Sequence, residues 1–321
     1  MAAKSLRHLL LALLVCLPAA VFADRTYVIG ITQIVEHPAL DAVTQGVRDE
    51  LTERGYEPGK NIRIMFESAQ GNTGTAAQIA RKFIGERPDA IVAIATPSAQ
   101  TVAAVARQIP VVFSAVTDPV GARLVPSLEA PGGNITGITD MIPLAHHIDF
   151  MLRVAPDTKT FGTVYNPGEA NAVALVELLE EALTERGLRL EKAAATRTSE
   201  VLGAARSLVG KVDAIYITTD NTVVSAAEAV ISVGERARIP VFAADTATVA
   251  RGAIAALGFD YYDVGRQTGV VVSRILAGER PGDIPVQGID RLSLHVNPGA
   301  AARMGITLSD EIIAEAERVI E

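Results

Sequence analysis

The sequence predicts an α/β protein with two parallel-sheet lobes joined by a hinge, and three observations support this prediction. Short, uninterrupted apolar runs such as 90–95 (AIVAIA) are typical of strands that a parallel sheet buries on both faces. Segments with helical spacing of apolar residues separate these runs, and each run ends in a polar loop. The alternation is interrupted around 134–140 and starts again at 160 with the same plan. We therefore expect two lobes of similar build, and a chain of 321 residues has room for both.

The first half is predicted to contain four strands with helices between them. Pro38 opens the first helix, because proline suits a first helical turn, and Gly55 ends it. Pro97 marks the start of a short third helix in the same way. The expected strands are 25–32, 61–67, 90–95 and 111–113; a second helix opens at 71–73, the third covers 98–107, and 134–140 is a strand or crossing segment.

The second half repeats this plan and then returns to the first lobe. The segment 253–262 and the helix 264–277 are expected to carry the chain back. This predicts an N-terminal lobe of 24–137 plus about 260–285 and a C-terminal lobe of 138–259 plus about 286–321, with the crossings acting as the hinge. Further expected elements are helices at 144–154, 172–186, 199–208 and 226–238, strands at 160–165, 188–195, 214–218, 241–243 and 292–296, and a terminal helix with Ile312, Ile313, Ala316 and Val319 as its apolar stripe.

The first 23 residues have the pattern of a secretory signal peptide. Lys4 and Arg7 form a basic region, 9–17 is an apolar run too short to span a membrane, and 21–23 is a small-residue cleavage site. Cleavage after Ala23 predicts an exported, periplasmic protein. The single cysteine, Cys16, lies within the apolar run, so we expect no disulfide and no thiolate metal site in the mature chain.

Charge and motifs argue against several function classes. A net charge of −8 speaks against a nucleic-acid partner, because nucleic acid requires a basic face. The sequence contains no G-x-x-x-x-G-K-[ST] phosphate loop, no G-x-G-x-x-G after the first strand and no G-x-S-x-G elbow. His37 has no partner at metal-ligand spacing, and the adjacent His146 and His147 point to different faces of any helix. We therefore expect no catalytic residue, no metal and no cofactor.

Polar loops after the strands form the expected ligand site. The carboxyl ends of parallel strands meet at one edge of a sheet, where helix N-termini favour negative groups. Any one Ser, Thr or Asp in these loops could instead be an ordinary cap or turn former. The candidate residues are Gln33, Glu36, His37, Thr96, Ser98, Ser114, Thr117 and Asp118 in the first half and Asn166, Glu169, Asn171, Asp220, Asn221, Asp245 and Thr246 in the second.

Seven phrases carry a specific resemblance to a known family: GITQIVEHPALDAV, ATPSAQTVA, VFSAVTDPVGA, VYNPGEANAVA, DAIYITTDNTVVSA, PVFAADTATVARGA and LGFDYYDVGRQTG. They resemble the ABC-transporter substrate-binding proteins of the tryptophan-binding type, over nearly the whole chain after the signal peptide. That family is similar to the type I periplasmic binding proteins. The resemblance therefore implies two Rossmann-like lobes joined by three crossings.

The resemblance also implies a solute-binding protein that closes on an amino acid, with an aromatic side chain as the family expectation, and delivers it to a membrane permease. First-lobe hydroxyls would hold the ligand's carboxylate. A carboxylate would pair with its ammonium group, because a buried ion without a partner is costly. The implied residues are Thr96, Ser98 and Thr117 for the carboxylate, Asp220 or Asp245, or else Glu36 or Asp118, for the ammonium, and Asn166, Glu169, Asn171 and Asn221 for closure from the second lobe.

The identity of the ligand has an alternative. Asp, Asn and Gln side chains bind ring hydroxyls equally well, so a sugar- or nucleoside-binding protein is the second hypothesis, and a role in sensing instead of transport is open. We expect a monomer. Phe113 and Phe242 lie in apolar strands and are expected to pack within their lobes. The aromatic stacking surfaces available to a ligand are Phe113, Tyr165, Phe242, Phe259, Tyr261 and Tyr262.

Overall fold

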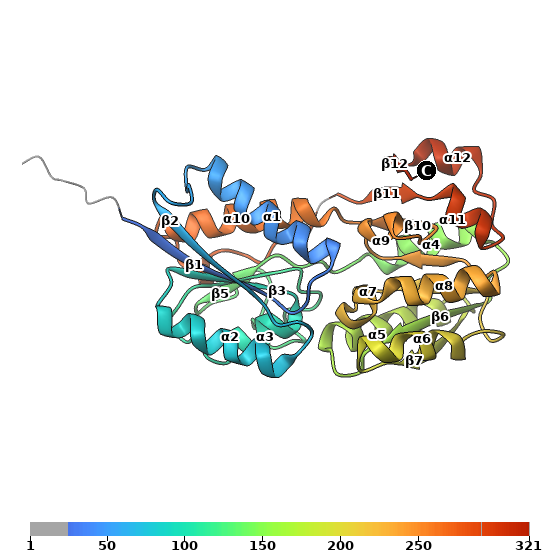
Figure 1. Ribbon diagram of the computed structural model, residues 1–321, viewed down its shortest axis with the longest axis horizontal. Helices are drawn as coiled ribbons and strands as arrows, with labels where there is room; N and C mark the ends of the chain where they lie inside the picture. Colours follow the sequence, from blue (N-terminus) through green and yellow to red (C-terminus); the bar gives the residue numbers. More distant parts are fainter. Residues whose placement is uncertain (1–24, 290, 321) are drawn as a thin grey trace, which may run out of the picture.

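The computed structural model describes residues 25–289 and 291–320, which form two β-sheets with helices packed around each (Figure 1). The signal peptide, Cys16 and the cleavage site after Ala23 lie outside the described residues. Within the described part of the chain, no helix is both long enough and apolar enough to cross a membrane. The predicted α/β class with two mainly parallel sheets is confirmed.

The first sheet has five parallel strands, which in spatial order are β2 (Ile62–Ser68), β1 (Tyr27–Gln33), β3 (Ala90–Ile94), β4 (Val111–Ser114) and β5 (Ile135–Gly137). The middle strand, β3, is buried at every position. Strands pair with both of its edges and helices pack on it, so no position faces water. This explains why its sequence is apolar without alternation.

The second sheet has seven strands, which in spatial order are β12 (Arg318–Val319), β11 (Ser293–Val296), β10 (Ala255–Gly258), β9 (Val241–Ala243), β8 (Ala214–Ile217), β6 (Thr160–Tyr165) and β7 (Arg189–Ala194). Strand β11 runs antiparallel to β10, and every other neighbouring pair is parallel. Strand β6 has the bounds that the sequence predicted.

The helices divide between the two sheets, and we name the two halves by this division. The N-lobe is the first sheet with α1 (Pro38–Glu53), α2 (Thr73–Glu86), α3 (Thr96–Ala103) and α10 (Tyr261–Leu276). The C-lobe is the second sheet with α4 (Leu144–Val154), α5 (Ala170–Thr184), α6 (Thr198–Ser207), α7 (Asn221–Ser225), α8 (Ala227–Ala237), α9 (Ala247–Ala250), α11 (Pro298–Arg303) and α12 (Asp310–Glu315).

The chain crosses between the lobes three times. The first crossing, 138–143, joins β5 to α4, and the second, 259–260, joins β10 to α10. The third starts at 284, after the 3-10 turn Pro281–Asp283, and leads to β11. The amide of Thr139 donates to the carbonyl oxygen of Gln287 over 2.9 Å, so the first and third crossings lie side by side. The lobe boundaries expected from the sequence stay a prediction.

Helices α1 and α10 pack against each other in the N-lobe although they are far apart in the sequence (Figure 1). They run in parallel, because Gly46 lies against Tyr262 while Glu50, one turn later, lies against Gly269. A methyl group built on Gly46 would lie 2.2 Å from the carbonyl oxygen of Tyr262, so the backbones approach with no side chain between them. Both helices therefore begin at the same end of the N-lobe.

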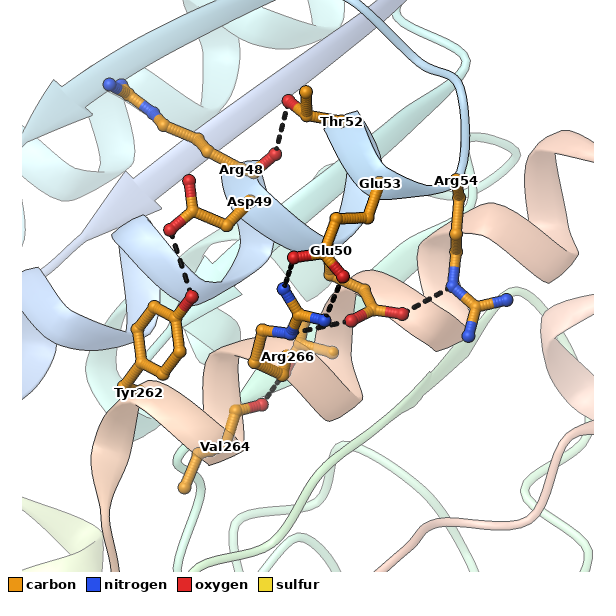
Figure 2. A network of polar contacts seen from close by, with 10 residues as sticks. Arg48, Asp49, Glu50, Thr52, Glu53, Arg54, Tyr262, Val264 and Arg266 are labelled. Atoms are coloured by element: carbon orange, nitrogen blue, oxygen red, sulfur yellow. Dashed lines mark hydrogen bonds and ion pairs between the residues drawn. The ribbon is translucent and has the colours of Figure 1, made fainter.

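A network of polar contacts joins the same two helices (Figure 2). Arg266 Nε lies 2.7 Å from Glu50 Oε2, and Arg266 Nη1 donates to Glu53 Oε1 over 2.6 Å. The hydroxyl of Tyr262 donates to Asp49 over 3.0 Å. Glu50 is buried, and the guanidinium groups of Arg54 and Arg266 form ion pairs with its carboxylate. The network fixes the first turns of α10 against α1.

The C-terminal helix is shorter than its apolar pattern predicted. The sequence placed Ala316 and Val319 on one stripe of a long helix, but α12 ends at Glu315 and the chain continues as β12. The amide of Glu317 donates to the carbonyl oxygen of Leu294, and that of Ile320 to Val296, each over 2.8 Å. Backbone pairing with the edge strand β11 therefore overrides the helical spacing.

Candidate functional site

A small cavity of about 20 Å³ lies between the lobes, which is room for about one water molecule in this arrangement of the lobes. The starts of α1 and α10 and the loop after β4 form its N-lobe side. The C-lobe side comes from the start of α5, the loops after β8 and β9, and α7. The lining residues are His37, Ala39, Leu40, Ala115, Asp140, Asn171, Thr219, Asp220, Asn221, Val224, Asp245 and Tyr261.

Two of the loops beside the site hold alanines in unusual backbone conformations. Ala95, directly after β3, has φ +71° and ψ 155°, and Ala115, directly after β4, has φ +52°. Residues other than glycine rarely adopt a positive φ angle, and backbone strain of this kind is common at ligand sites. Because the chain turns sharply after each strand, α3 and the loop after β4 both begin close to the inter-lobe edge.

Three aspartates, Asp140, Asp220 and Asp245, line the cavity, and we call them the acidic cluster. All three are buried, and burial raises the pKa of each carboxyl, that of Asp220 to about 8 with help from the charge of Glu169. Among the described residues, no arginine or lysine forms an ion pair with any of them. The described His, Cys, Asp and Glu side chains also include no group of three arranged to hold a metal ion. The cluster therefore brings together three buried carboxyl groups that no ion pair with a described residue neutralises, although the charge of Arg251 acts on Asp245.

The members of the acidic cluster differ in what holds them. Asp220 accepts the amides of Val223 (2.9 Å) and Asn166 (2.5 Å), and it caps α7. Asp245 accepts the amide and the hydroxyl of Thr248 (2.8 and 2.7 Å). Asp140 is different, because the side chains that donate to its oxygens are two hydroxyl groups, that of Thr117 (3.0 Å) and that of Tyr261 (2.7 Å), and it caps no helix.

His37 lines the cavity as a neutral imidazole. It is the N-cap of α1, and its Nδ1 accepts the amide of Leu40 over 3.4 Å. Burial, with a smaller contribution from the charge of Arg251, lowers the pKa of His37 to about 3. Because Nδ1 is the acceptor, the proton of the neutral ring is assigned to Nε2. His37 therefore adds a donor without adding charge.

Several buried polar atoms have no hydrogen-bond partner among the described residues. The hydroxyls of Thr96 and Ser98, at the start of α3, are two of them, although neither residue lines the cavity, and Asn171 Oδ1 is a third. Buried polar groups are nearly always paired, so such atoms indicate a missing partner. Asn171 itself lines the cavity, and its amide group already donates to the carbonyl oxygen of Thr219.

A second, wider hollow of about 520 Å³ adjoins the first, with Asn221 in the wall of both. Glu169, which lines the wider hollow, accepts hydrogen bonds from the amide (3.1 Å) and side chain (2.6 Å) of Asn221 and from the amide (3.1 Å) and hydroxyl (2.8 Å) of Thr222. Asn166 lies beside it and also donates to Thr222. These C-lobe side chains form the rim of the site.

The structure brings together only part of the predicted set. Of the candidates, His37, Asn171, Asp220, Asn221 and Asp245 line the cavity. Thr117 reaches it through Asp140, and its hydroxyl lies 3.3 Å from that of Thr219 in the opposite lobe. Five candidates do not line it and have partners elsewhere: Gln33 with Asp41 and Thr44, Glu36 with Gln70, Ser114 with Thr268, Asp118 with the amide of Gly121, and Thr246 with the carbonyl oxygen of Phe259.

Several lining residues are not among the candidates predicted from the sequence. Thr219 opens the polar run that contains Asp220 and Asn221, and this neighbourhood was a usable signal. Asp140 ends the crossing segment at 134–140, where no strand-end rule applied. Tyr261 was named only as one of several aromatic surfaces, whereas Phe113 and Phe242 are core residues as expected. The remaining missed residues are Ala39, Leu40, Ala115 and Val224, which have no polar group to single them out.

Comparisons with known proteins find relatives of this chain in sequence and in structure. A family model described as ABC transporter substrate binding protein matches residues 28–320. The tyrosine-binding protein of Clostridioides difficile is 38% identical over 269 residues, which cover 84% of this chain and 78% of that protein. A crystal structure of a conserved domain protein from Vibrio cholerae has 47% identity and a TM-score of 0.90, covering 92% of this chain and 100% of that chain. The ABC domain from Streptococcus pneumonia in complex with L-Trp has 33% identity and a TM-score of 0.88, with the same coverage.

Proposed function

The chain belongs to the family of ABC transporter substrate-binding proteins, and from this membership we propose that it binds an aromatic amino acid in the cavity between its lobes. It is an extracytoplasmic binding protein and not an enzyme. We further propose that cleavage after Ala23 releases it into the periplasm. There it would act as a monomer and deliver its ligand to a membrane permease.

The acidic cluster is the observation that carries this proposal. Asp140, Asp220 and Asp245 face one small cavity, and no described arginine or lysine pairs with them. A buried carboxylate is expensive unless a cation or several donors compensate it. The ammonium group of an amino acid supplies one positive charge and three donors, which suits such a cluster. A neutral sugar would supply donors but no charge.

The start of α3 is the proposed place for the ligand's carboxylate. The hydroxyls of Thr96 and Ser98 are buried there without a partner among the described residues, and the first amides of a helix favour a negative group. The hydroxyl of Thr117, at the end of the neighbouring loop, already donates to Asp140 and so leaves the ligand's carboxylate to Thr96 and Ser98. A zwitterion would thus have its two charges matched by opposite sides of the site.

The apolar part of the lining favours an apolar side chain on the ligand. Leu40, Val224 and the ring of Tyr261 face the cavity, and none of them carries a charge. A relative that is 38% identical is named a tyrosine-binding protein, and a structure that is 33% identical holds L-Trp. We therefore propose tyrosine, tryptophan or phenylalanine as the ligand, with Asn166, Glu169, Asn171 and Asn221 closing over it from the C-lobe.

A thermal-shift screen of residues 24–321 tests the ligand class. A ligand that binds only the folded protein stabilises it by about 2.7 kcal/mol at a concentration one hundred times its Kd. We expect shifts with L-Trp, L-Tyr or L-Phe and none with sugars or nucleosides. A shift with sugars or nucleosides alone would replace the amino-acid hypothesis by its alternative. Titration calorimetry of the responding ligands then gives each Kd and distinguishes a preferred ligand from weak ones.

A further inference from the structure

Asp140 lies on the first crossing between the lobes, and its carboxylate faces the ligand cavity. We propose that Asp140 pairs with the ammonium group of the ligand and that this pair links the ligand to the segments on which the lobes turn. The inference rests on the proposed amino-acid ligand. It selects one carboxylate from the acidic cluster and gives it a second role, in positioning the lobes.

The partners of the three aspartates favour Asp140. Asp220 and Asp245 each accept backbone amides at the start of short helices, which are fixed donors of the C-lobe fold. These contacts with backbone amides are enough to explain why an aspartate stands at each of the two positions. Asp140 caps no helix, and its side-chain donors are two hydroxyls, which can turn towards another acceptor. Asp140 is therefore the carboxylate of the cluster that is not tied to the start of a helix.

The position of Asp140 is as informative as its partners. Tyr261, which donates to it, is the first residue of α10, directly after the second crossing. Its chain neighbour Thr139 donates through its amide to Gln287 on the third crossing. All three crossings thus meet within one residue of Asp140. A change in the charge of Asp140 therefore affects the hydrogen bonds at the crossing segments, where a hinge between the lobes must bend.

A fourth contact connects Asp140 to the opposite lobe. Thr117, the second hydroxyl donor, comes from the N-lobe and lies 3.3 Å from Thr219 of the C-lobe, oxygen to oxygen. An ammonium group at Asp140 keeps this carboxylate ionised, and an ionised carboxylate holds both hydroxyl donors more strongly than a neutral one. Ligand binding would thereby strengthen the contacts that join Thr117, Tyr261 and the first crossing.

Titration calorimetry with matched ligands and variants tests the pairing. The ligands are L-tyrosine and its analogue without the amino group, 3-(4-hydroxyphenyl)propionate, and the proteins are wild type and Asp140→Asn. We expect wild type to bind tyrosine at least about 30-fold more tightly than the analogue, because losing one partner of a buried charge pair costs about 2–5 kcal/mol. Asp140→Asn is expected to bind both ligands within about threefold of each other. Its binding of the analogue also shows that the variant is folded.

Asp118→Asn is the matched control, because Asp118 does not line the cavity and accepts the amide of Gly121, and it is expected to keep the preference of wild type for tyrosine over the analogue. Asp220→Asn and Asp245→Asn test the two competing assignments of the ammonium partner. If either one loses this preference while Asp140→Asn keeps it, the assignment to Asp140 is overturned. Should wild type bind no aromatic amino acid at all, the proposed function fails instead, before the question of Asp140 arises. The two failures are therefore distinguishable.

Tyr261→Phe tests the link to the crossings, because it keeps the ring in the cavity and removes only the donor to Asp140. If Asp140 acts on the crossings through Tyr261, the variant weakens binding of tyrosine by about tenfold or more but affects the analogue much less. An equal loss for both ligands would show that Tyr261 has only a structural role and would refute the link. Small-angle scattering then compares the compaction that saturating tyrosine causes in both proteins, which we expect to be smaller in Tyr261→Phe.

Discussion

Gly265 of α10 and Val43 of α1 contact each other backbone to backbone: a methyl group built on Gly265 would lie 2.2 Å from the carbonyl oxygen of Val43. This approach is closer than any side chain permits. Because the helices are parallel, it determines where α10 begins, and Tyr261 at that start lines the ligand cavity. A contact remote from the ligand therefore helps to shape the site.

Gly265→Ala is expected to destabilise the protein by about 1–3 kcal/mol, because the added methyl group must push the two helices apart. Urea denaturation measures the change in the free energy of unfolding. Gly203→Ala, on an exposed position of α6 with open space around it, is the control. That change is expected to be neutral or to stabilise by about 0.5–1 kcal/mol, the usual gain of alanine over glycine in a helix. Equal effects of the two substitutions would contradict the proposed packing.

Asp220 makes the stability of the ligand-free protein depend on pH. Burial raises the pKa of its carboxyl to about 8, whereas the carboxyl of an unfolded aspartate titrates near 4. Between these values the folded protein holds a proton that the unfolded chain has lost. The contribution of Asp220 therefore lowers the free energy of unfolding as the pH rises from about 4 to about 8.

Asp220→Asn removes this titration. We expect the stability of the variant relative to wild type to increase with pH between about 4 and 8 and to level off above. Urea denaturation of both ligand-free proteins at several pH values across this range gives the two curves. Curves that stay parallel throughout would show that Asp220 is ionised in the folded protein at neutral pH.

Glu169→Gln is expected to destabilise the C-lobe by about 1–3 kcal/mol, because four donors of Asn221 and Thr222 converge on one carboxylate and an amide accepts at only one of its two ends. Thermal or urea denaturation measures the loss. Glu185→Gln, at an exposed position just after α5, is the control and is expected to change stability by less than about 0.5 kcal/mol. Similar stabilities of the two variants would argue against Glu169 as the organiser of α7.

Leu40→Ala is expected to change which ligand is preferred. Leu40 lies in the first turn of α1 and faces the cavity, so its removal leaves space beside the ligand's side chain. We expect about 1–3 kcal/mol weaker binding of tyrosine and phenylalanine, and a smaller loss for the larger tryptophan. Calorimetry with the three amino acids gives the ratios of Kd. Leu179→Ala, in the core of α5, should lower stability but leave these ratios as they are in wild type.

The fold was predictable where local sequence and tertiary structure agree. The run at 90–95 could only be a doubly covered strand, and β3 covers Ala90–Ile94. The helix at 144–154 and the strand at 160–165 have the expected bounds. At 316–320 the two levels disagree, because the spacing is helical but an edge strand offers unpaired backbone groups. Sheet pairing is decided by distant parts of the chain, and local spacing contains no information about it.

The site was predictable only as a set of loops. Strand-end rules led to Asp220, Asn221 and Asp245, which line the cavity, and equally to Glu36 and Thr246, which do not. Which residues of a loop face a ligand depends on the loop's conformation and on the opposite lobe. Leu40 has no polar group that would mark it as a ligand contact, and it faces the cavity because α1 begins at the inter-lobe edge.

The position of α10 in the N-lobe has a consequence for how the protein folds during its synthesis. The first sheet needs α10 to cover β3 and β4, yet this helix follows β6 to β10 in the chain. A ribosome must therefore translate most of the C-lobe before the N-lobe can bury its last face. Domains usually fold in the order of their synthesis, but here the first lobe cannot finish first. A chain that stays incompletely folded until late in translation is well suited to threading through an export channel in an extended form.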